Sequence, residues 1–138
     1  MIEVEQVDFV SVPTRDVTGA VSWYSDVFGF PRSEASEGEV EAPNVTLAFW
    51  NPERDGEEFV PNAAGIALRV ADVASAVEDV RAAGGVVVGI EDTGVCHMGF
   101  VEDPDGNTVI LHRRYAARGA TSAPEVHPRC GSTDGAHP

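Results

Sequence analysis

Two histidines, His97 and His112, lie in consecutive apolar segments separated by a turn rich in Asp, Pro and Gly. Histidine titrates near neutral pH, so a histidine pair can bind a ligand or exchange a proton with it. The residue types of Asp103–Gly106 favour a tight turn, and pairing across it sets Val101 opposite Thr108. His97 would then lie opposite His112. We predict that the two imidazoles are cross-strand neighbours, as a ligand-binding or acid–base pair or as a solvated pair at a rim.

The residues that share a face with His112 define a predicted binding surface. Alternation along a strand puts Thr108 and Ile110 on that face. In the first half of the chain the matching strand turns Trp50 inward. Trp50 and Phe9 would let a flat ligand stack on them, whereas core filling is the alternative interpretation of Trp50. The predicted ligand-binding residues are Phe9, Trp50, His97, Thr108, Ile110 and His112.

Two other groups of reactive side chains are not predicted to do chemistry. Cys96 adjoins His97, but neighbours on a strand point to opposite faces, so the two cannot form a nucleophile–base pair. Farther along, His127, Cys130 and His137 are irregularly spaced in a segment rich in Ala, Pro, Gly, Ser and Thr. That spacing does not favour a metal site.

The elements that would position these residues occur twice along the chain. At one constant offset, Asp16 matches Asp72 and Gly29 matches Gly85. Each copy has an alternating apolar strand, an acidic N-cap, apolar residues at helical spacing and a glycine that ends the helix. The pattern indicates a duplicated unit.

The predicted fold is α+β, with two βαβββ modules that form a cupped mixed sheet with the helices on its convex side. The modules are expected over residues 1–62 and 63–115, the first less regular than the second. From residue 116 to 138 the periodicity is lost, and we predict a mobile tail. A concave sheet face is where a ligand is expected.

Charge and hydropathy exclude several classes of protein. The formal net charge is −14, and every basic residue apart from histidine is an arginine. Because phosphate binding relies on clustered Lys and Arg, no nucleic-acid partner is predicted. No apolar run approaches the ~20 residues of a membrane span, and the acidic N-terminal segment is unlike a signal peptide. We predict a cytoplasmic protein whose acidity reflects either a solvated surface or adaptation to high salt.

Three segments resemble the vicinal oxygen chelate superfamily, which includes glyoxalase I, extradiol dioxygenases, fosfomycin-resistance enzymes and bleomycin-resistance proteins. They are VDFVSVPTRDVTGAVSWYSDVFGF, GIALRVADVASAVEDVRAAGG and GFVEDPDGNTVILHRRY, and together they span about residues 5 to 115. The strand–DPDGN–strand segment is the most specific. The resemblance implies paired βαβββ modules around a cupped sheet, in a homodimer.

The resemblance also implies where a divalent metal would bind. In metal-dependent relatives, the ligands lie on the first and last strands of each module. The matching positions here hold Phe9, Ala48, Gly65 and Ile110, none of which has a donor atom in its side chain. A divalent ion needs about three N, O or S donors. We therefore predict no metal and no cofactor, as in the metal-free bleomycin-resistance-like members.

Three functions are compatible with these features. The first is a metal-free protein that binds a drug-like or aromatic small molecule. The second is a lyase or isomerase that uses His97 or His112 as a general base. The third is a divergent, metal-dependent dioxygenase-like enzyme. The missing metal donors favour the first, while catalysis and the identity of the ligand stay open.

Overall fold

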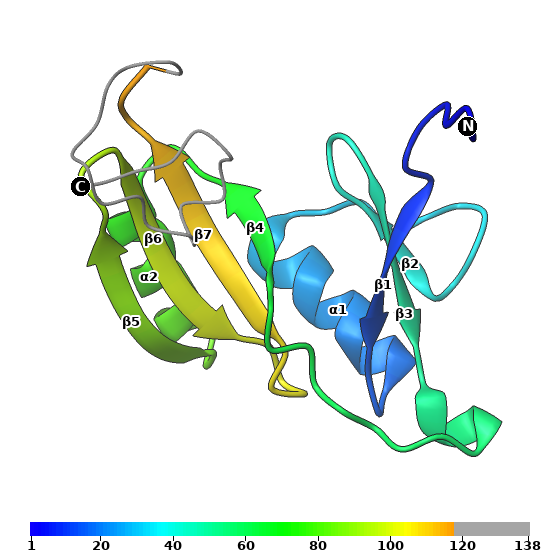
Figure 1. Cartoon of the computed structure of the whole chain (residues 1–138). Coiled ribbons are helices and arrows are strands. Elements are labelled where there is room, and N and C mark those ends of the chain that lie inside the picture. The colour runs from blue at the N-terminus through cyan, green and yellow to red at the C-terminus, as the bar shows by residue number, and fades with distance from the viewer. Residues whose placement is uncertain (118–138) are drawn as a thin grey trace. The chain divides into compact units, whose positions relative to one another are not determined.

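The chain separates into two compact units (Figure 1). The computed structural model describes residues 1–117 of the 138. Unit 1 comprises Met1–Asn62 together with Pro104–Asn107, and unit 2 comprises Ala63–Asp103 with the chain from Thr108 onward. Most of the predicted tail therefore lies outside the described residues, as do His127, Cys130 and His137. No helix within residues 1–117 is long and apolar enough to cross a membrane.

Unit 1 contains one helix and a mixed three-stranded sheet of order β1-β3-β2. Its elements are β1 (Phe9–Pro13), α1 (Val17–Phe28), β2 (Glu39–Glu41), β3 (Thr46–Trp50) and the short 3-10 helix η1 (Pro52–Asp55). Strand β1 is parallel to β3, and β2 is antiparallel to it. Arg32, which lies between α1 and β2, forms an isolated bridge with Val40 of β2. A strand of the predicted βαβββ pattern is thus reduced to one bridge, in agreement with the weaker periodicity of this half.

Local sequence explains where α1 begins and ends. The side chain of Asp16 accepts a hydrogen bond from the backbone N–H of Gly19, which satisfies a donor of the first turn. Gly29 ends the helix with φ of 70°, a conformation that glycine adopts without strain. The buried face of α1 includes Tyr24, whose ring lies 4.9 Å from that of Phe49 on β3. The helix therefore covers one face of the sheet and leaves the other open.

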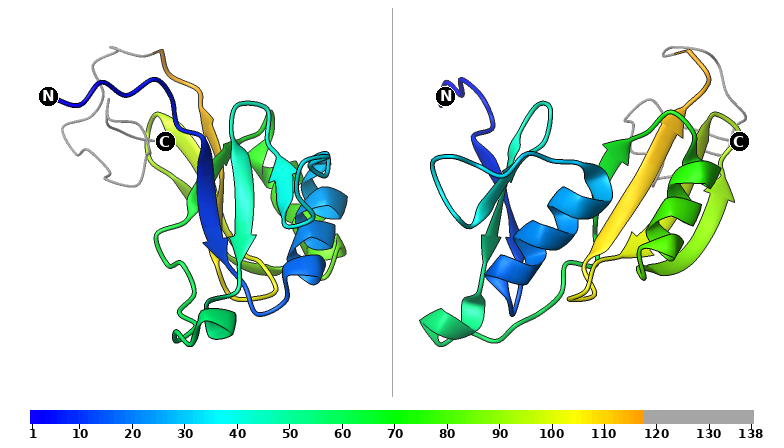
Figure 2. Two further views of the ribbon diagram at one scale, coloured as in Figure 1. Left: turned by 90° about the vertical axis from the view of Figure 1, so that its right-hand side faces the viewer. Right: turned by 180° about the vertical axis from the view of Figure 1, so that it is seen from behind.

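Unit 2 is a complete βαβββ module with sheet order β4-β7-β6-β5. Its elements are β4 (Ile66–Arg69), α2 (Val73–Ala82), β5 (Val86–Asp92), β6 (Cys96–Glu102) and β7 (Thr108–Arg114). Strands β4 and β7 are parallel, and the other pairs are antiparallel. Helix α2 packs against β5, β6 and β7 on one side of the sheet (Figure 2). We call the side away from α2 the open face of unit 2.

The register of β6 differs by one residue from the sequence prediction. Val101 pairs with Val109 rather than with Thr108. Consequently His97 pairs with Arg113, and the prediction that it lies opposite His112 is wrong. Because strand faces alternate, this shift turns every β6 side chain to the side opposite the predicted one.

The connection between β6 and β7 explains the shift. Five residues, 103–107, separate the paired ends Glu102 and Thr108. The last of them, Asn107, is only 1% exposed, and its amide binds backbone groups of unit 1. These side-chain bonds hold Asn107 within the connection, and β7 begins one residue later than a four-residue turn would require.

Candidate ligand-binding site on the open face of unit 2

The open face of unit 2 contains a hollow of about 820 Å³. All four strands contribute to it, together with the segment that leads into β4. Its lining residues are Ala63, Ala64, Gly65, Ala67, Val88, Gly89, Ile90, Glu91, Phe100, Glu102, Thr108 and Ile110. Most of these side chains are small or aliphatic, which leaves space above the sheet. A volume of this size is typical of small-molecule sites.

Strand pairing fixes the central part of this hollow. Phe100 of β6 pairs with Ile110 of β7, and Ala67 of β4 pairs with Ile110 from the other side. Glu102 pairs with Thr108 one step nearer the turn. The hollow therefore combines an aromatic ring, a branched aliphatic side chain, a hydroxyl and a carboxylate on neighbouring strands.

A glycine keeps the entrance to β4 open. Gly65 has φ of +88°, which other residues adopt only with strain. A Cβ there would lie 2.9 Å from Cγ2 of Thr108 and 3.2 Å from Cγ1 of Ile110. Any larger residue at Gly65 would thus occupy part of the hollow.

Three predicted site residues lie on the open face of unit 2. Thr108 and Ile110 line the hollow. His112 is two residues beyond Ile110 on β7 and pairs with Met98, so it shares the face but not the hollow's lining. The predicted facing of β7 is correct.

His97 lies on the opposite side of the sheet from the hollow. Its Nε2 is 3.5 Å from Oδ2 of Asp92, and its ring centroid is 4.7 Å from that of Tyr115. The Tyr115 hydroxyl donates a hydrogen bond to Asp92 over 3.1 Å. Burial and the negative charge of Asp92 raise the pKa of Tyr115 above its usual 10.0. His97 is therefore part of a surface cluster at the end of β6 and not of the candidate site.

Phe9 and Trp50 belong to the open face of unit 1. Phe9 is 55% exposed at the start of β1, and Trp50 is 41% exposed at the end of β3. Since Phe9 pairs with Thr46 and Trp50 with Pro13, the two aromatic residues are at opposite ends of the same ladder. The Trp50 indole donates to Oδ2 of Asp55 over 2.7 Å. Trp50 is thus held on the surface rather than filling the core.

The residues present do not fit the divalent metal of metal-dependent relatives. Phe9, Ala48, Gly65 and Ile110 occupy the expected ligand positions, and none supplies a side-chain donor. Residues 1–117 contain no group of three His, Cys, Asp or Glu side chains arranged to hold a metal. At Gly65 the backbone conformation itself disfavours a ligand such as histidine. No metal-assisted chemistry follows from these positions.

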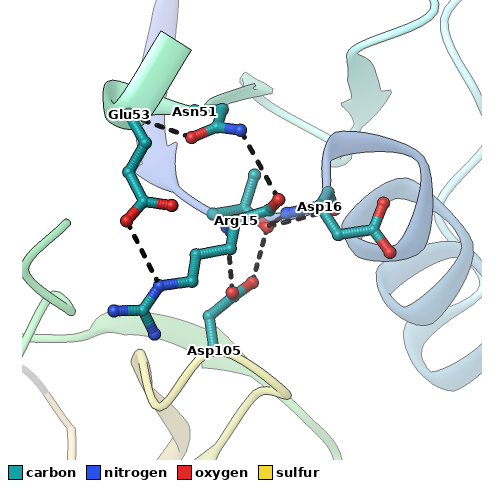
Figure 3. Close-up of polar contacts among 6 residues, drawn as sticks. Arg15, Asp16, Asn51, Glu53 and Asp105 are labelled. Atoms are coloured by element: carbon teal, nitrogen blue, oxygen red, sulfur yellow. Dashed lines mark hydrogen bonds and ion pairs between the residues drawn. The ribbon is translucent and has the colours of Figure 1, made fainter. Parts of the chain in front are cut away.

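The DPDGN turn has a structural role in unit 1 (Figure 3). The Asp105 carboxylate accepts a 2.6 Å hydrogen bond from the Thr14 hydroxyl and a 3.0 Å bond from the backbone N–H of Arg15. The guanidinium of Arg15 is 3.7 Å from Glu53 and lies over the ring of Phe59 at 4.2 Å. This network fixes the loop between β1 and α1. The motif that most strongly suggested the family therefore supports the fold and supplies no side chain to the hollow.

Of the twelve lining residues, the sequence prediction named only Thr108 and Ile110 as ligand-binding, and Glu102 and Phe100 are among those that it missed. Both lie on β6 and were assigned to the wrong face, or to none, by the one-residue error in register. The available signal was the length of the DPDGN segment, since a five-residue connection places Glu102 opposite Thr108. Only the contacts of Asn107 show that it belongs to the connection and not to β7.

Comparison with known proteins supports the fold and identifies the family. Residues 6–111 match the family model described as Glyoxalase/Bleomycin resistance protein/Dioxygenase superfamily. No curated protein sequence gives a significant match.

Several solved structures share the fold at low sequence identity. Virulence protein STM3117 from Salmonella typhimurium is 18% identical, with a TM-score of 0.64 over 82% of this chain and 99% of that one. A superfamily member from Sphaerobacter thermophilus is 20% identical, with a TM-score of 0.64 over 79% and 97%. TnmS3, an antibiotic binding protein from Streptomyces sp. CB03234, is 22% identical, with a TM-score of 0.65 over 83% and 99%. The predicted α+β fold with two βαβββ-like modules is confirmed, and the chain belongs to the Glyoxalase/Bleomycin resistance protein/Dioxygenase superfamily.

Proposed function

We propose that the protein binds a small, largely apolar molecule in the hollow of unit 2 without a metal. The observation that carries this proposal is the hollow itself, which offers about 820 Å³ beside Phe100 and Ile110. Ligand sites of this size are usually apolar with a few polar groups that orient the ligand. Thr108 and Glu102 are the polar groups at its centre.

The positions of the histidines favour binding over acid–base catalysis. A general base must reach the proton that it removes, directly or through one water. His97 is on the other side of the sheet, and His112 is not among the residues that line the hollow. The lyase or isomerase alternative would therefore need a ligand that reaches beyond the hollow to His112.

The ligand contacts follow from the same geometry. We assign apolar contact to Phe100 and Ile110 and a hydrogen bond to the hydroxyl of Thr108. His112 stays a proposed contact for a ligand that extends along β7. Phe9 and Trp50 stay proposed aromatic contacts on the open face of unit 1.

The oligomeric state, the cellular location and the class of partner are also proposals. We infer a homodimer, because α1 covers only one face of the three-stranded sheet of unit 1 and twofold dimers are the commonest closed assembly. The acidity of the chain supports the absence of a nucleic-acid partner, and a cytoplasmic location stays a proposal.

Native mass spectrometry tests the dimer and the absence of metal together. We expect twice the 14.6 kDa chain mass and no stoichiometric metal after growth in metal-supplemented medium. We expect no metal because Phe9, Ala48, Gly65 and Ile110, at the four expected ligand positions, have no donor atom in their side chains. Elemental analysis of the same sample is the cross-check. About one zinc, iron, manganese or nickel per chain that survives mild chelation would contradict metal independence, and a clean monomer at tens of micromolar would contradict the dimer.

The binding proposal is tested by filling the hollow. Ala67 is exposed and pairs with Ile110, so Ala67→Phe should place a ring in the hollow at little cost to folding. For N-phenyl-1-naphthylamine, a neutral fluorescent probe, we expect the affinity to fall about tenfold or more. Ala74→Phe is the matched control, because Ala74 is exposed on α2, on the covered side of the sheet. Equal affinities of wild type and Ala67→Phe would reject this site.

A further inference from the structure

The charge within the hollow indicates what kind of ligand it accepts. Its charged lining residues are Glu91 and Glu102, and within residues 1–117 no arginine or histidine lines it. The chain as a whole carries −14. An anionic ligand would meet a negative potential both on approach and when bound, whereas a cation would be attracted.

Glu102 is the carboxylate whose position the strand pairing defines best. It pairs with Thr108, is half-buried and follows Phe100 on the same face of β6. Its side chain therefore lines the hollow together with Thr108, Phe100 and Ile110. A carboxylate next to apolar surface loses part of its hydration, which strengthens a charge-assisted hydrogen bond to an ammonium or amidinium group.

The rest of the lining suits the body of such a ligand. Phe100 offers a ring for stacking, and Ile110 with the alanines at 63, 64 and 67 offers aliphatic contact. Together, these features would accept a molecule with one cationic end and one apolar or aromatic end.

We propose that the hollow is selective for organic cations, in which an aromatic or aliphatic body lies against Phe100 and Ile110 and an amine pairs with Glu102. This inference rests on the proposed function of the same site and adds its ligand class and a residue that determines specificity. Glu102 acts as a counter-ion and needs no metal or covalent step.

Three probes with one naphthalene body test the inference. They are 1-naphthylmethylamine, which is an ammonium at pH 7, the neutral 1-naphthalenemethanol and the anionic 1-naphthylacetate. Each probe is titrated into the wild-type chain, and binding is followed by the amide shifts of β6 and β7 in NMR spectra. We expect the amine to bind with about tenfold higher affinity than the alcohol, and the acetate to bind most weakly.

Two variants assign the selectivity to one carboxylate. Glu102→Gln keeps the shape of the side chain. In this variant the affinity for the amine should fall to that for the alcohol, while the affinity for the alcohol changes less than about twofold. Glu78→Gln is the matched control, because Glu78 is exposed on α2 and absent from the hollow's lining, and it should keep the preference. Thermal melting of each variant shows that both are folded.

The outcomes separate this inference from the proposed function. If the alcohol binds in the hollow and the amine binds no tighter, the cation selectivity is wrong while the binding function stands. If the amine is preferred but keeps its advantage in Glu102→Gln, the assignment to Glu102 is wrong. If none of the three shifts the amides of β6 and β7 in the folded wild type, both proposals are overturned.

Discussion

Asn107→Ala should lower the free energy of unfolding by about 2–3 kcal/mol, because it leaves two backbone groups without their partner. The Asn107 side-chain amide donates to the carbonyl of Pro13 over 2.8 Å and accepts from the backbone N–H of Asn62 over 2.8 Å. Its side chain is almost fully buried, at 1% exposure. Water cannot replace these hydrogen bonds without opening this part of unit 1.

Urea denaturation of the full chain measures the effect. The matched control is Asn44→Ala, because Asn44 is exposed and has no side-chain hydrogen bond among those found in residues 1–117. It should change stability by no more than about 0.5 kcal/mol. A loss below about 1 kcal/mol in Asn107→Ala would mean that the DPDGN turn contributes little to unit 1.

The helices and their first residues were predictable because local contacts determine them, whereas α2 is capped by Ala83 and ends before the predicted glycine. Asp72 caps α2 as Asp16 caps α1, and in each case the carboxylate accepts from a backbone N–H three residues ahead. The apolar spacing after each cap selects the buried face, which includes Val73 and Val77 in α2. These signals come from residues within one or two helical turns of each other, so they can be recognised in the sequence alone.

The facing of β7 was also predictable, whereas that of β6 was not. For β7, once Ile110 is placed on the open face, the alternation of side chains along a strand places Thr108 and His112 there too. For β6, the register depends on Asn107, whose partners Pro13 and Asn62 are 94 and 45 residues away. Long-range bonds of this kind leave no periodic pattern in the sequence, and a one-residue slip reverses a whole strand.

The hollow depends on features that are equally hard to see in the sequence. Strand β5 has a register shift between Val87 and Gly89 where it pairs with β6. At the other side of the sheet, Gly65 enters β4 with a positive φ. Bulges and glycine conformations change which side chains line a face. The residue types in the sequence suggested a ligand site, but its shape and its carboxylate follow from the strand pairing.

Gly99→Ala should destabilise the protein by about 2–3 kcal/mol, because the observed register places Gly99 under helix α2. A Cβ at this position would lie 2.5 Å from Cγ2 of Val77 and 3.2 Å from Cγ1 of Val73. Both valines are buried, and β-branched side chains have little rotamer freedom in a helix. Overpacking of this kind typically costs 1–3 kcal/mol and outweighs the small gain expected from replacing a strand glycine.

Gly89→Ala provides the matched control on the neighbouring strand. Gly89 pairs with Phe100, and a Cβ there would have no neighbouring atom within 4 Å. We expect the same change of residue to be neutral or to stabilise by up to about 1 kcal/mol, because alanine restricts the unfolded chain. The register predicted from the sequence would have placed Gly99 on the open face, where alanine fits. Comparison of the two variants by urea denaturation therefore tests which face β6 turns toward α2. The same comparison tests the place of Glu102 in the hollow. A Gly99→Ala variant as stable as Gly89→Ala would reject the observed register.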